Sequence, residues 1–203
     1  MNNLLLIGNG GHAISCIDVI EAENKYKIFG VVAKENEIEN KKILYPNVGT
    51  DKDLKTLFEK IKTAFIGIGF IKNPEIRLNI FSNLKSIGFS LPTIISPNSY
   101  KAKSSNINEG TILMHKSIIN SEVKIGSNCI INTGSIIEHE AIIGDNVHIS
   151  TSTVVNGAVH VGSGSFIGSN SVIQEGVKIG DNCIVAAGSY LRKDLSSGTT
   201  FYK

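Results

Sequence analysis

The sequence predicts two domains of different classes, a doubly wound α/β domain over residues 1–97 and a parallel β-helix over residues 98–203. Two observations carry this prediction. An aliphatic residue recurs at every sixth position in the second half, and strand-like segments alternate with helix-like segments in the first half. Hydrophobic residues make up 41% of the chain and charged residues 19%, which is enough apolar surface for a folded core.

The six-residue repeat is the strongest signal in the chain. Fifteen consecutive positions spaced six apart, from Ile107 to Leu191, are all Ile, Leu or Val. Small or β-branched residues precede most of them by two positions, and Gly, Asn or Asp often follows, as turns require. One such unit is a hexapeptide rung, and three rungs close an 18-residue coil. A helix is excluded because a period of six does not keep one face of a 3.6-residue helix.

Cysteine usage and charge limit the compartment and the partners. Cys129 and Cys183 are three whole coils apart, so we expect both to stack inside the prism as small apolar side chains. Three cysteines without a CxxC motif suit a reducing cytosol and argue against structural zinc. The N-terminus lacks the features of a signal peptide, no apolar run is long enough for a membrane span, and a net charge of +2 gives no reason to expect nucleic acid. We therefore expect a cytoplasmic protein.

The first half reads as a parallel sheet with helices. The expected strands are Leu4–Ile7, Tyr26–Val32, Ala64–Gly69 and Leu91–Ile95. The expected helices run from the glycine turn to about Glu21, from Asp51 as N-cap to Lys60, and from Pro74 to Ile87 with Gly88 past the end. The segment Ser96–Asn98 is the expected linker.

The turn after the first strand fits a phosphate-binding pattern, Gly8-x-Gly10-x-x-Ala13. Such a turn leaves backbone N–H groups free, and the helix N-terminus adds partial positive charge for a diphosphate. The dinucleotide version expects an acid after the second strand, but Ala33 and Lys34 stand there and Glu35 is the first acid, which disfavours NAD. A nucleotide diphosphate fits, with Gly67–Gly69 at the neighbouring strand end. The alternative is a turn that only packs the helix on the sheet.

His139 is the candidate general base. It is the second residue after an inward Ile, so it should project outward near a corner, between Glu138 and Glu140. A carboxylate can fix the tautomer of an imidazole and raise its basicity, and Gly157, one coil later, should stack beside it and leave room for a ligand. The alternative is a solvated surface histidine. His148 and His160 are also expected to point outward, and no histidine pair has metal-ligand spacing.

These motifs together resemble the NeuD/PglD family of sugar acetyltransferases. The most specific stretches are Asn132–Glu140 and Ile143–His148, and Gly8–His12 and Gly67–Gly69 match the N-terminal signatures. The resemblance implies a Rossmann-like domain followed by a left-handed β-helix, a homotrimer, and acetyl-CoA in a cleft between neighbouring prisms. Ala33-Lys34 departs from the acids that the family often carries after the second strand.

The resemblance also implies roles for residues. His139 would be the catalytic base and Glu140 its orienting carboxylate. The implied contacts to acetyl-CoA are Asn132, His148, Gly157, Lys178 and Ala187. The implied contacts to the sugar nucleotide are Asn9, Gly10, Gly11, His12, Lys34, Gly67, Ile68 and Gly69.

The function expected on these grounds is acetyl-CoA-dependent N-acetylation of a nucleotide-linked amino sugar, of the UDP- or dTDP-4-amino-4,6-dideoxyhexose type, for glycan biosynthesis. Two alternatives stay open. One is O-acetylation of sialic acid or a related nonulosonic acid by the same fold. The other is a non-catalytic scaffold that binds a sugar nucleotide. A dehydrogenase is disfavoured by Ala33-Lys34.

Overall fold

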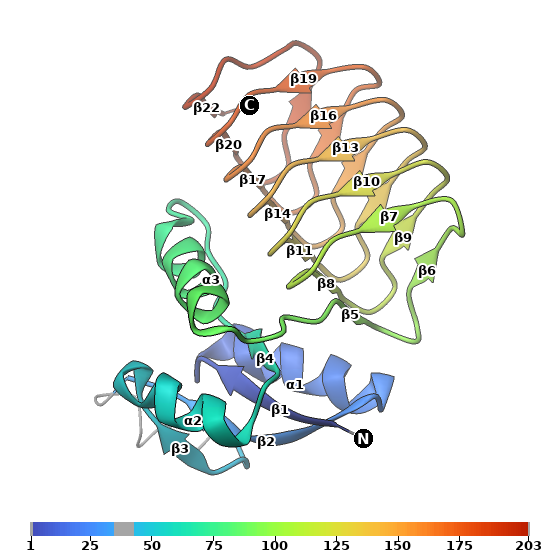
Figure 1. The fold of residues 1–203 in the computed structure, drawn as a ribbon. Helices are drawn as coiled ribbons and strands as arrows, with labels where there is room; N and C mark the ends of the chain where they lie inside the picture. Colours follow the sequence, from blue (N-terminus) through green and yellow to red (C-terminus); the bar gives the residue numbers. More distant parts are fainter. Residues whose placement is uncertain (1, 35–42, 203) are drawn as a thin grey trace.

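The computed structural model describes residues 2–34 and 43–202 and shows an α/β domain packed against one end of a β-helix (Figure 1). Glu35 lies outside the described residues. The elements of the α/β domain are β1 (Asn2–Ile7), α1 (Gly11–Glu23), β2 (Tyr26–Val32), β3 (Asn47–Gly49), η2 (Asp51–Asp53), α2 (Leu54–Lys60), β4 (Ala64–Ile66) and α3 (Glu75–Ile87). The four strands form one parallel sheet in the order β3-β2-β1-β4.

The sequence predicted β2 at its observed bounds and the end of β1 at Ile7, because apolar runs mark buried parallel strands. The strand expected at Ala64–Gly69 is shorter, because β4 ends at Ile66, before the glycine turn. The cap of the second helical segment was predicted wrongly. Thr50, not Asp51, precedes the first helical residue, and its backbone N–H donates to the Asp53 carboxylate at 2.8 Å. A threonine three residues before an acid is the capping-box pattern, which outranks a single Asp as a start signal.

The β-helix consists of two-residue strands that stack into three parallel sheets, one on each side of a triangular prism (Figure 1). We call them the docked sheet, which faces the α/β domain, the open sheet and the polar sheet. The docked sheet contains β5 (Ile94–Ile95), β8 (Ile112–Leu113), β11 (Ile130–Ile131), β14 (His148–Ile149), β17 (Phe166–Ile167), β20 (Ile184–Val185) and β22 (Thr200–Phe201).

The open sheet contains β6 (Tyr100–Lys101), β9 (Ile118–Ile119), β12 (Ile136–Ile137), β15 (Val154–Val155), β18 (Val172–Ile173) and β21 (Tyr190–Leu191). The polar sheet contains β7 (Asn106–Ile107), β10 (Lys124–Ile125), β13 (Ile142–Ile143), β16 (His160–Val161) and β19 (Lys178–Ile179). Strand partners within each sheet are 18 residues apart, as in the pairing of Ile136 with Val154. The predicted left-handed β-helix and its coil length are confirmed.

The last strand expected in the first domain belongs to the β-helix instead. β5 pairs with β8 of the docked sheet and makes no pair with the α/β sheet. Ile95 is in phase with the six-residue repeat, two rungs before Ile107, but Lys101 breaks the aliphatic series between them. The boundary between residues 97 and 98 stays a prediction.

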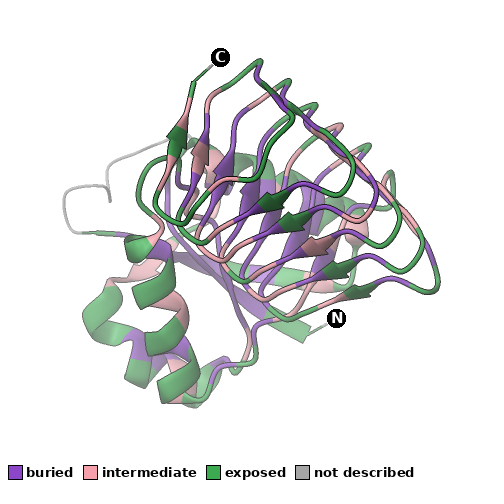
Figure 2. Cartoon of the chain, turned by 90° about the horizontal axis from the view of Figure 1, so that it is seen from above, coloured by how far each residue is buried: buried purple, intermediate pink, exposed green. Residues whose placement is uncertain are grey.

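The interior of the prism is filled by the periodic aliphatic residues, seen as buried segments that alternate with exposed ones around each coil (Figure 2). Cys129 and Cys183 lie among them with no exposed surface, which confirms their predicted position. A second apolar cluster joins the two domains, because α1 packs its buried face on the outward residues Ile112 and Ile130 of the docked sheet. The packing of α1 on the β-helix therefore fixes the position of the glycine turn that precedes α1.

Candidate active site

His139 lies where the sequence predicted it, at the corner that follows the open-sheet strand β12, and its side chain is 55% exposed. Its Nδ1 is 3.1 Å from Oε2 of Glu140. A carboxylate only accepts, so Nδ1 carries the proton and the lone pair stays on Nε2, the arrangement that a general base needs. The other flanking acid does not contribute, because Glu138 accepts a hydrogen bond from Asn120 at 2.9 Å.

Gly157 lies directly beside His139, one coil further along. A Cβ atom at this position would be 2.6 Å from Cε1 and 2.7 Å from Nε2 of the imidazole, closer than side-chain carbons approach. The space that we expected to remain for a ligand is thus occupied by the imidazole itself. Within the described residues, the Gly157 N–H makes no backbone hydrogen bond, whereas the next residue, Ala158, donates to the His139 carbonyl at 2.9 Å.

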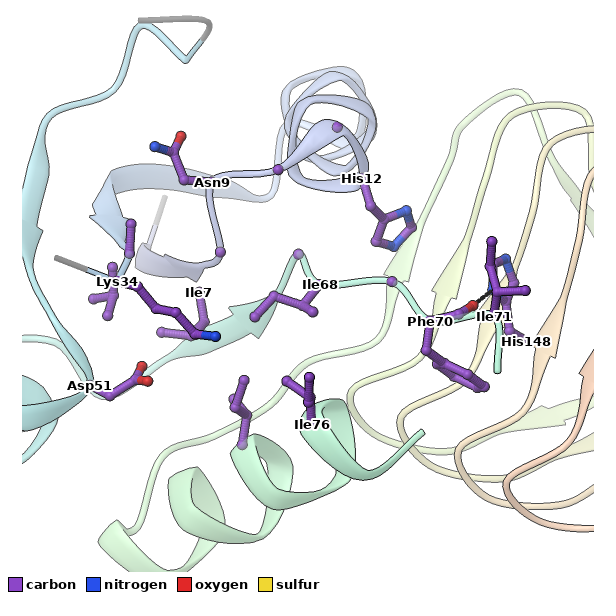
Figure 3. Close-up of a pocket in the computed structure, with 18 residues that line it drawn as sticks. Ile7, Asn9, His12, Lys34, Asp51, Ile68, Phe70, Ile71, Ile76 and His148 are labelled. Carbon is purple, nitrogen blue, oxygen red and sulfur yellow. Dashed lines mark hydrogen bonds between the residues drawn. The ribbon is translucent and has the colours of Figure 1, made fainter. Parts of the chain in front are cut away.

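A cavity of about 700 Å³ opens at the carboxyl ends of β1, β2 and β4 (Figure 3). All eight residues predicted to contact a sugar nucleotide line it, and His148 does so as well. Lys34 and Asp51 lie at one end, and His12, Phe70 and His148 lie at the other (Figure 3). The volume is in the range of small-molecule and cofactor sites.

The three glycines of the first turn differ in whether the fold requires them. Gly8 has φ +112°, and an added Cβ would come within 2.6 Å of Ile68 Cγ1, so the fold requires glycine there. Gly10 and Gly11 have no atom within 4 Å of an added Cβ. Neither the backbone nor packing requires glycine at these two positions. The N-cap residue of α1 is Gly10, which has no side chain to cap the helix, and an anion in the cavity could accept from the first N–H groups.

His12 is half-buried in the cavity wall; its Nε2 atom is itself buried and has no hydrogen-bond partner among the described residues. Burial, reinforced by the nearby positive charge of Arg77, lowers its pKa to about 3. The imidazole is therefore neutral at physiological pH, and one buried ring nitrogen has no partner among the described residues.

His148 points outward from the docked sheet but is buried under the α/β domain. Its Nδ1 is 2.7 Å from the Phe70 carbonyl oxygen and its Nε2 is 3.2 Å from Nδ2 of Asn132. The carbonyl accepts and the amide nitrogen donates, so His148 is neutral with the proton on Nδ1. Burial is the main cause that lowers its pKa to about 4.

The predicted acetyl-CoA contacts therefore fall into separate groups. Asn132 and His148 bond to each other beside the cavity, and Gly157 lies beside His139. Ala187 is exposed at the corner that also contains Asn132, and it lies three coils after Thr133, the residue next to Asn132. Lys178 is exposed on the polar sheet. Their roles stay predictions.

Arg77 and Phe70 were not identified from the sequence, and Asp51 was expected only as a helix cap. The burial of Arg77 could have been predicted, because Arg77 lies seven residues before the buried Leu84 and therefore on the same face of its helix. Phe70 contributes a backbone carbonyl, which no sequence pattern reveals. Across residues 2–34 and 43–202, no group of three or more potential ligand side chains could hold a metal ion, and no helix has the length and apolar character to cross a bilayer.

Comparison with known proteins supports the same two-part organisation. Residues 3–84 match the family described as the PglD N-terminal domain, and residues 158–193 match the bacterial transferase hexapeptide repeat. No curated protein sequence matches the chain.

Several solved structures share the whole fold. PerB from Caulobacter crescentus, solved with CoA and GDP-perosamine, is 29% identical with a TM-score of 0.90, and the match covers 98% of this chain and 93% of that one. The acetyltransferase domain of PglB from Neisseria gonorrhoeae, solved with acetyl coenzyme A, is 25% identical with a TM-score of 0.90 and coverages of 98% and 96%. WeeI from Acinetobacter baumannii, at 21% identity and a TM-score of 0.85 over 98% and 96%, shows the fold.

The low pKa values of His12 and His148 predict how stability depends on pH. Below about pH 6.5 the unfolded chain takes up protons on these side chains before the folded chain does, so stability falls as the pH drops from about 6.5, down to about 4 for His148 and about 3 for His12. Chemical denaturation of wild type and His148→Gln at pH 7 and pH 5 measures this. We expect a smaller loss of stability on acidification in the variant, with His160→Gln as a control for removing an exposed imidazole. Equal losses in wild type and His148→Gln would contradict the assignment.

Proposed function

We propose that this chain, which belongs to the NeuD/PglD family of sugar acetyltransferases, transfers the acetyl group of acetyl-CoA to the amino group of a nucleotide-linked amino sugar. The observation that carries the proposal is the exposed imidazole of His139, oriented by Glu140 and seated on Gly157. The relatives solved with CoA, acetyl-CoA and GDP-perosamine support both substrate classes. The expected sugar is of the 4-amino-4,6-dideoxyhexose type.

The proposed reaction is a direct transfer. The sugar amine attacks the thioester carbonyl carbon, a C–N bond forms, the C–S bond breaks, and CoA leaves as the thiolate. The lone pair on His139 Nε2 takes the proton that the amine sheds, and this proton can then pass to the thiolate. Cys129 and Cys183 are fully buried inside the prism, so neither provides a covalent nucleophile.

The Gly157 N–H is suited to the oxyanion that develops on the thioester carbonyl. It lies beside the base and makes no backbone hydrogen bond within the described residues. One such donor contributes about 3 kcal/mol to transition-state stabilisation in comparable sites.

The cavity of the α/β domain is the proposed site of the sugar nucleotide. The N-terminus of α1, with its partial positive charge, and the ammonium of Lys34 attract the diphosphate. The unpartnered Nε2 of His12 then faces the sugar end. Lys34 stands where the family often carries an acid, and Asp51, on the neighbouring strand end, supplies a carboxylate in the same cavity.

The outer face of the open sheet supports a homotrimer. The outward position of every strand in this sheet is apolar, and none of these residues is buried. The column consists of Tyr100, Ile118, Ile136, Val154, Val172 and Tyr190. On the polar sheet the same positions are Asn106, Lys124, Ile142, His160 and Lys178. A continuous apolar face on one side of the prism marks an association surface, and a second copy of the chain is the occupant that closed symmetry provides.

This trimer would complete the site. The open sheet lies between two corners, one with His139 and the other with Asn132, which bonds to His148 beside the cavity. When the open sheets of three copies face a common axis, the His139 corner of each copy meets the Asn132 corner of the next. The base of one chain then serves the sugar nucleotide held by its neighbour. Three free, buried cysteines suit a cytoplasmic setting for this assembly.

The activity is tested by release of free thiol from acetyl-CoA across a set of nucleotide-linked 4-amino sugars, with free sialic acid as comparison. We expect acceptor-dependent thiol release by wild type, almost none by His139→Ala with acetyl-CoA affinity retained, and normal release by His160→Ala, which removes another exposed imidazole. Release with sialic acid alone would favour O-acetylation. Binding without release would favour a scaffold, and normal turnover by His139→Ala would refute the role of the base.

The contact between Gly157 and the base gives a second test. We expect Gly157→Ala to displace the imidazole and lower kcat by about 100-fold, as displacements of about 1 Å do. Glu175→Ala, at the equivalent exposed corner position one coil further, is the matched control and keeps the wild-type rate. An unchanged kcat in Gly157→Ala would show that the observed imidazole position is not the catalytic one.

The open sheet gives a third test. Val154→Glu introduces a charge in the middle of the apolar column, and Ile142→Glu makes the same change on the polar sheet, where the side chain is similarly half-exposed. Sedimentation or light scattering is expected to give a trimer for wild type and Ile142→Glu and a smaller species for Val154→Glu. A trimer in all three proteins would place the interface elsewhere.

A further inference from the structure

Arg77 is a fully buried arginine whose hydrogen bonds all go to backbone carbonyls. It projects from the first turn of α3 and has no exposed surface. Its Nη1 donates to the carbonyls of Ile66 at 2.7 Å and Ile68 at 2.8 Å. Its Nε donates to the Asn128 carbonyl at 3.1 Å, and Nη2 lies 3.4 Å from the Gly110 carbonyl.

These acceptors belong to both domains. Ile66 and Ile68 flank Gly67 in the wall of the cavity, whereas Gly110 and Asn128 lie at a corner of the first coils of the β-helix. The guanidinium therefore ties the glycine-containing wall of the cavity to the platform that carries His148. Its planar fork of five donors makes this fixed arrangement possible.

Arg77 also places a charge without a counterion next to the cavity. No ion pair joins it to a carboxylate within the described part of the chain. Burial lowers its pKa only to about 10, so it stays protonated at neutral pH. Its charge contributes to the low pKa values of both His12 and His148. Burying a cation without a counterion costs folding free energy. An anion bound in the neighbouring cavity would offset part of that cost.

We propose that Arg77 is a positioning residue for the sugar nucleotide: it holds the Gly67–Gly69 wall of the cavity in register with the β-helix and adds positive potential for the diphosphate. This inference rests on the proposed function for its substrate. Two glycines in a three-residue wall are intrinsically mobile, and fixing them before binding removes part of the ordering cost of the ligand.

A neighbouring contact separates positioning from simple attachment of the domains. Lys85, on the same helix, forms an ion pair of 2.8 Å with Glu109 of the β-helix, next to Gly110. This contact also joins α3 to the first coils, but it does not reach the cavity wall. Removing Lys85 therefore reproduces the loss of a bridge between domains without the loss of positioning.

The test compares Arg77→Lys, Arg77→Met and Lys85→Met by KM for each substrate, kcat and Tm. We expect Arg77→Lys, which keeps the charge but not the fork, to raise KM for the sugar nucleotide about tenfold and to leave KM for acetyl-CoA within about twofold. Arg77→Met is expected to raise the sugar-nucleotide KM further, and Lys85→Met to leave both KM values unchanged. If Arg77→Met does not fold, the sugar-nucleotide KM of Arg77→Lys alone tests the positioning role.

Calorimetric binding of UDP and GDP to the same proteins keeps this inference separate from the proposed reaction. If wild type binds a nucleotide but transfers no acetyl group, the proposed function fails and nucleotide affinity still tests Arg77. An unchanged nucleotide affinity and KM in Arg77→Lys, or an equal rise of both KM values, would overturn the positioning role.

Discussion

The hydrogen-bonded stacking of one coil on the next, 18 residues later, is the constraint on which the rest of the structure depends. It places each residue beside its counterpart in the neighbouring coil, so the choice of one small residue decides what the adjacent coil can hold. Gly157 accommodates the His139 imidazole in this way, and the pairing of Asn120 with Glu138 follows the same spacing. The stacking also generates three outer faces of different character, of which one carries the α/β domain and one is uniformly apolar.

Much of this could be predicted from sequence because the β-helix repeats a local rule. One inward aliphatic residue per rung fixes the coil length, and the coil length fixes the neighbours of His139 and the interior position of Cys129. The six-residue rule failed where a rung lacks its aliphatic residue. Lys101 interrupts the series, so the strand at Ile95 was expected in the α/β sheet, whereas it pairs with β8 of the docked sheet. Periodicity places a residue on a face, but it does not say what covers that face.

Contacts between segments distant in sequence lay beyond sequence analysis. His148 was predicted to point outward, which it does, but its carbonyl partner is 78 residues away in another domain. That contact, with the Asn132 amide, fixes its tautomer and uses both ring nitrogens, so His148 has no lone pair left for a substrate in this arrangement. His12 is its opposite, because its Nε2 is buried and unpartnered. The two histidines at this end of the cavity therefore differ: both ring nitrogens of His148 have protein partners, whereas Nε2 of His12 has none among the described residues.

The position of His139 on an exposed corner follows from the different requirements of a nucleotide cavity and a general base. A nucleotide cavity needs the carboxyl ends of a parallel sheet and a helix N-terminus, which the α/β domain provides against the docked sheet. A base needs a fixed imidazole with a free lone pair, which the coil stacking provides at a corner of the open sheet. One chain carries both parts on different faces, and an isolated imidazole in water gains little from preorganisation. In the proposed trimer, association through the apolar open sheet would remove that water and bring the two parts together, so assembly and catalysis would depend on the same surface.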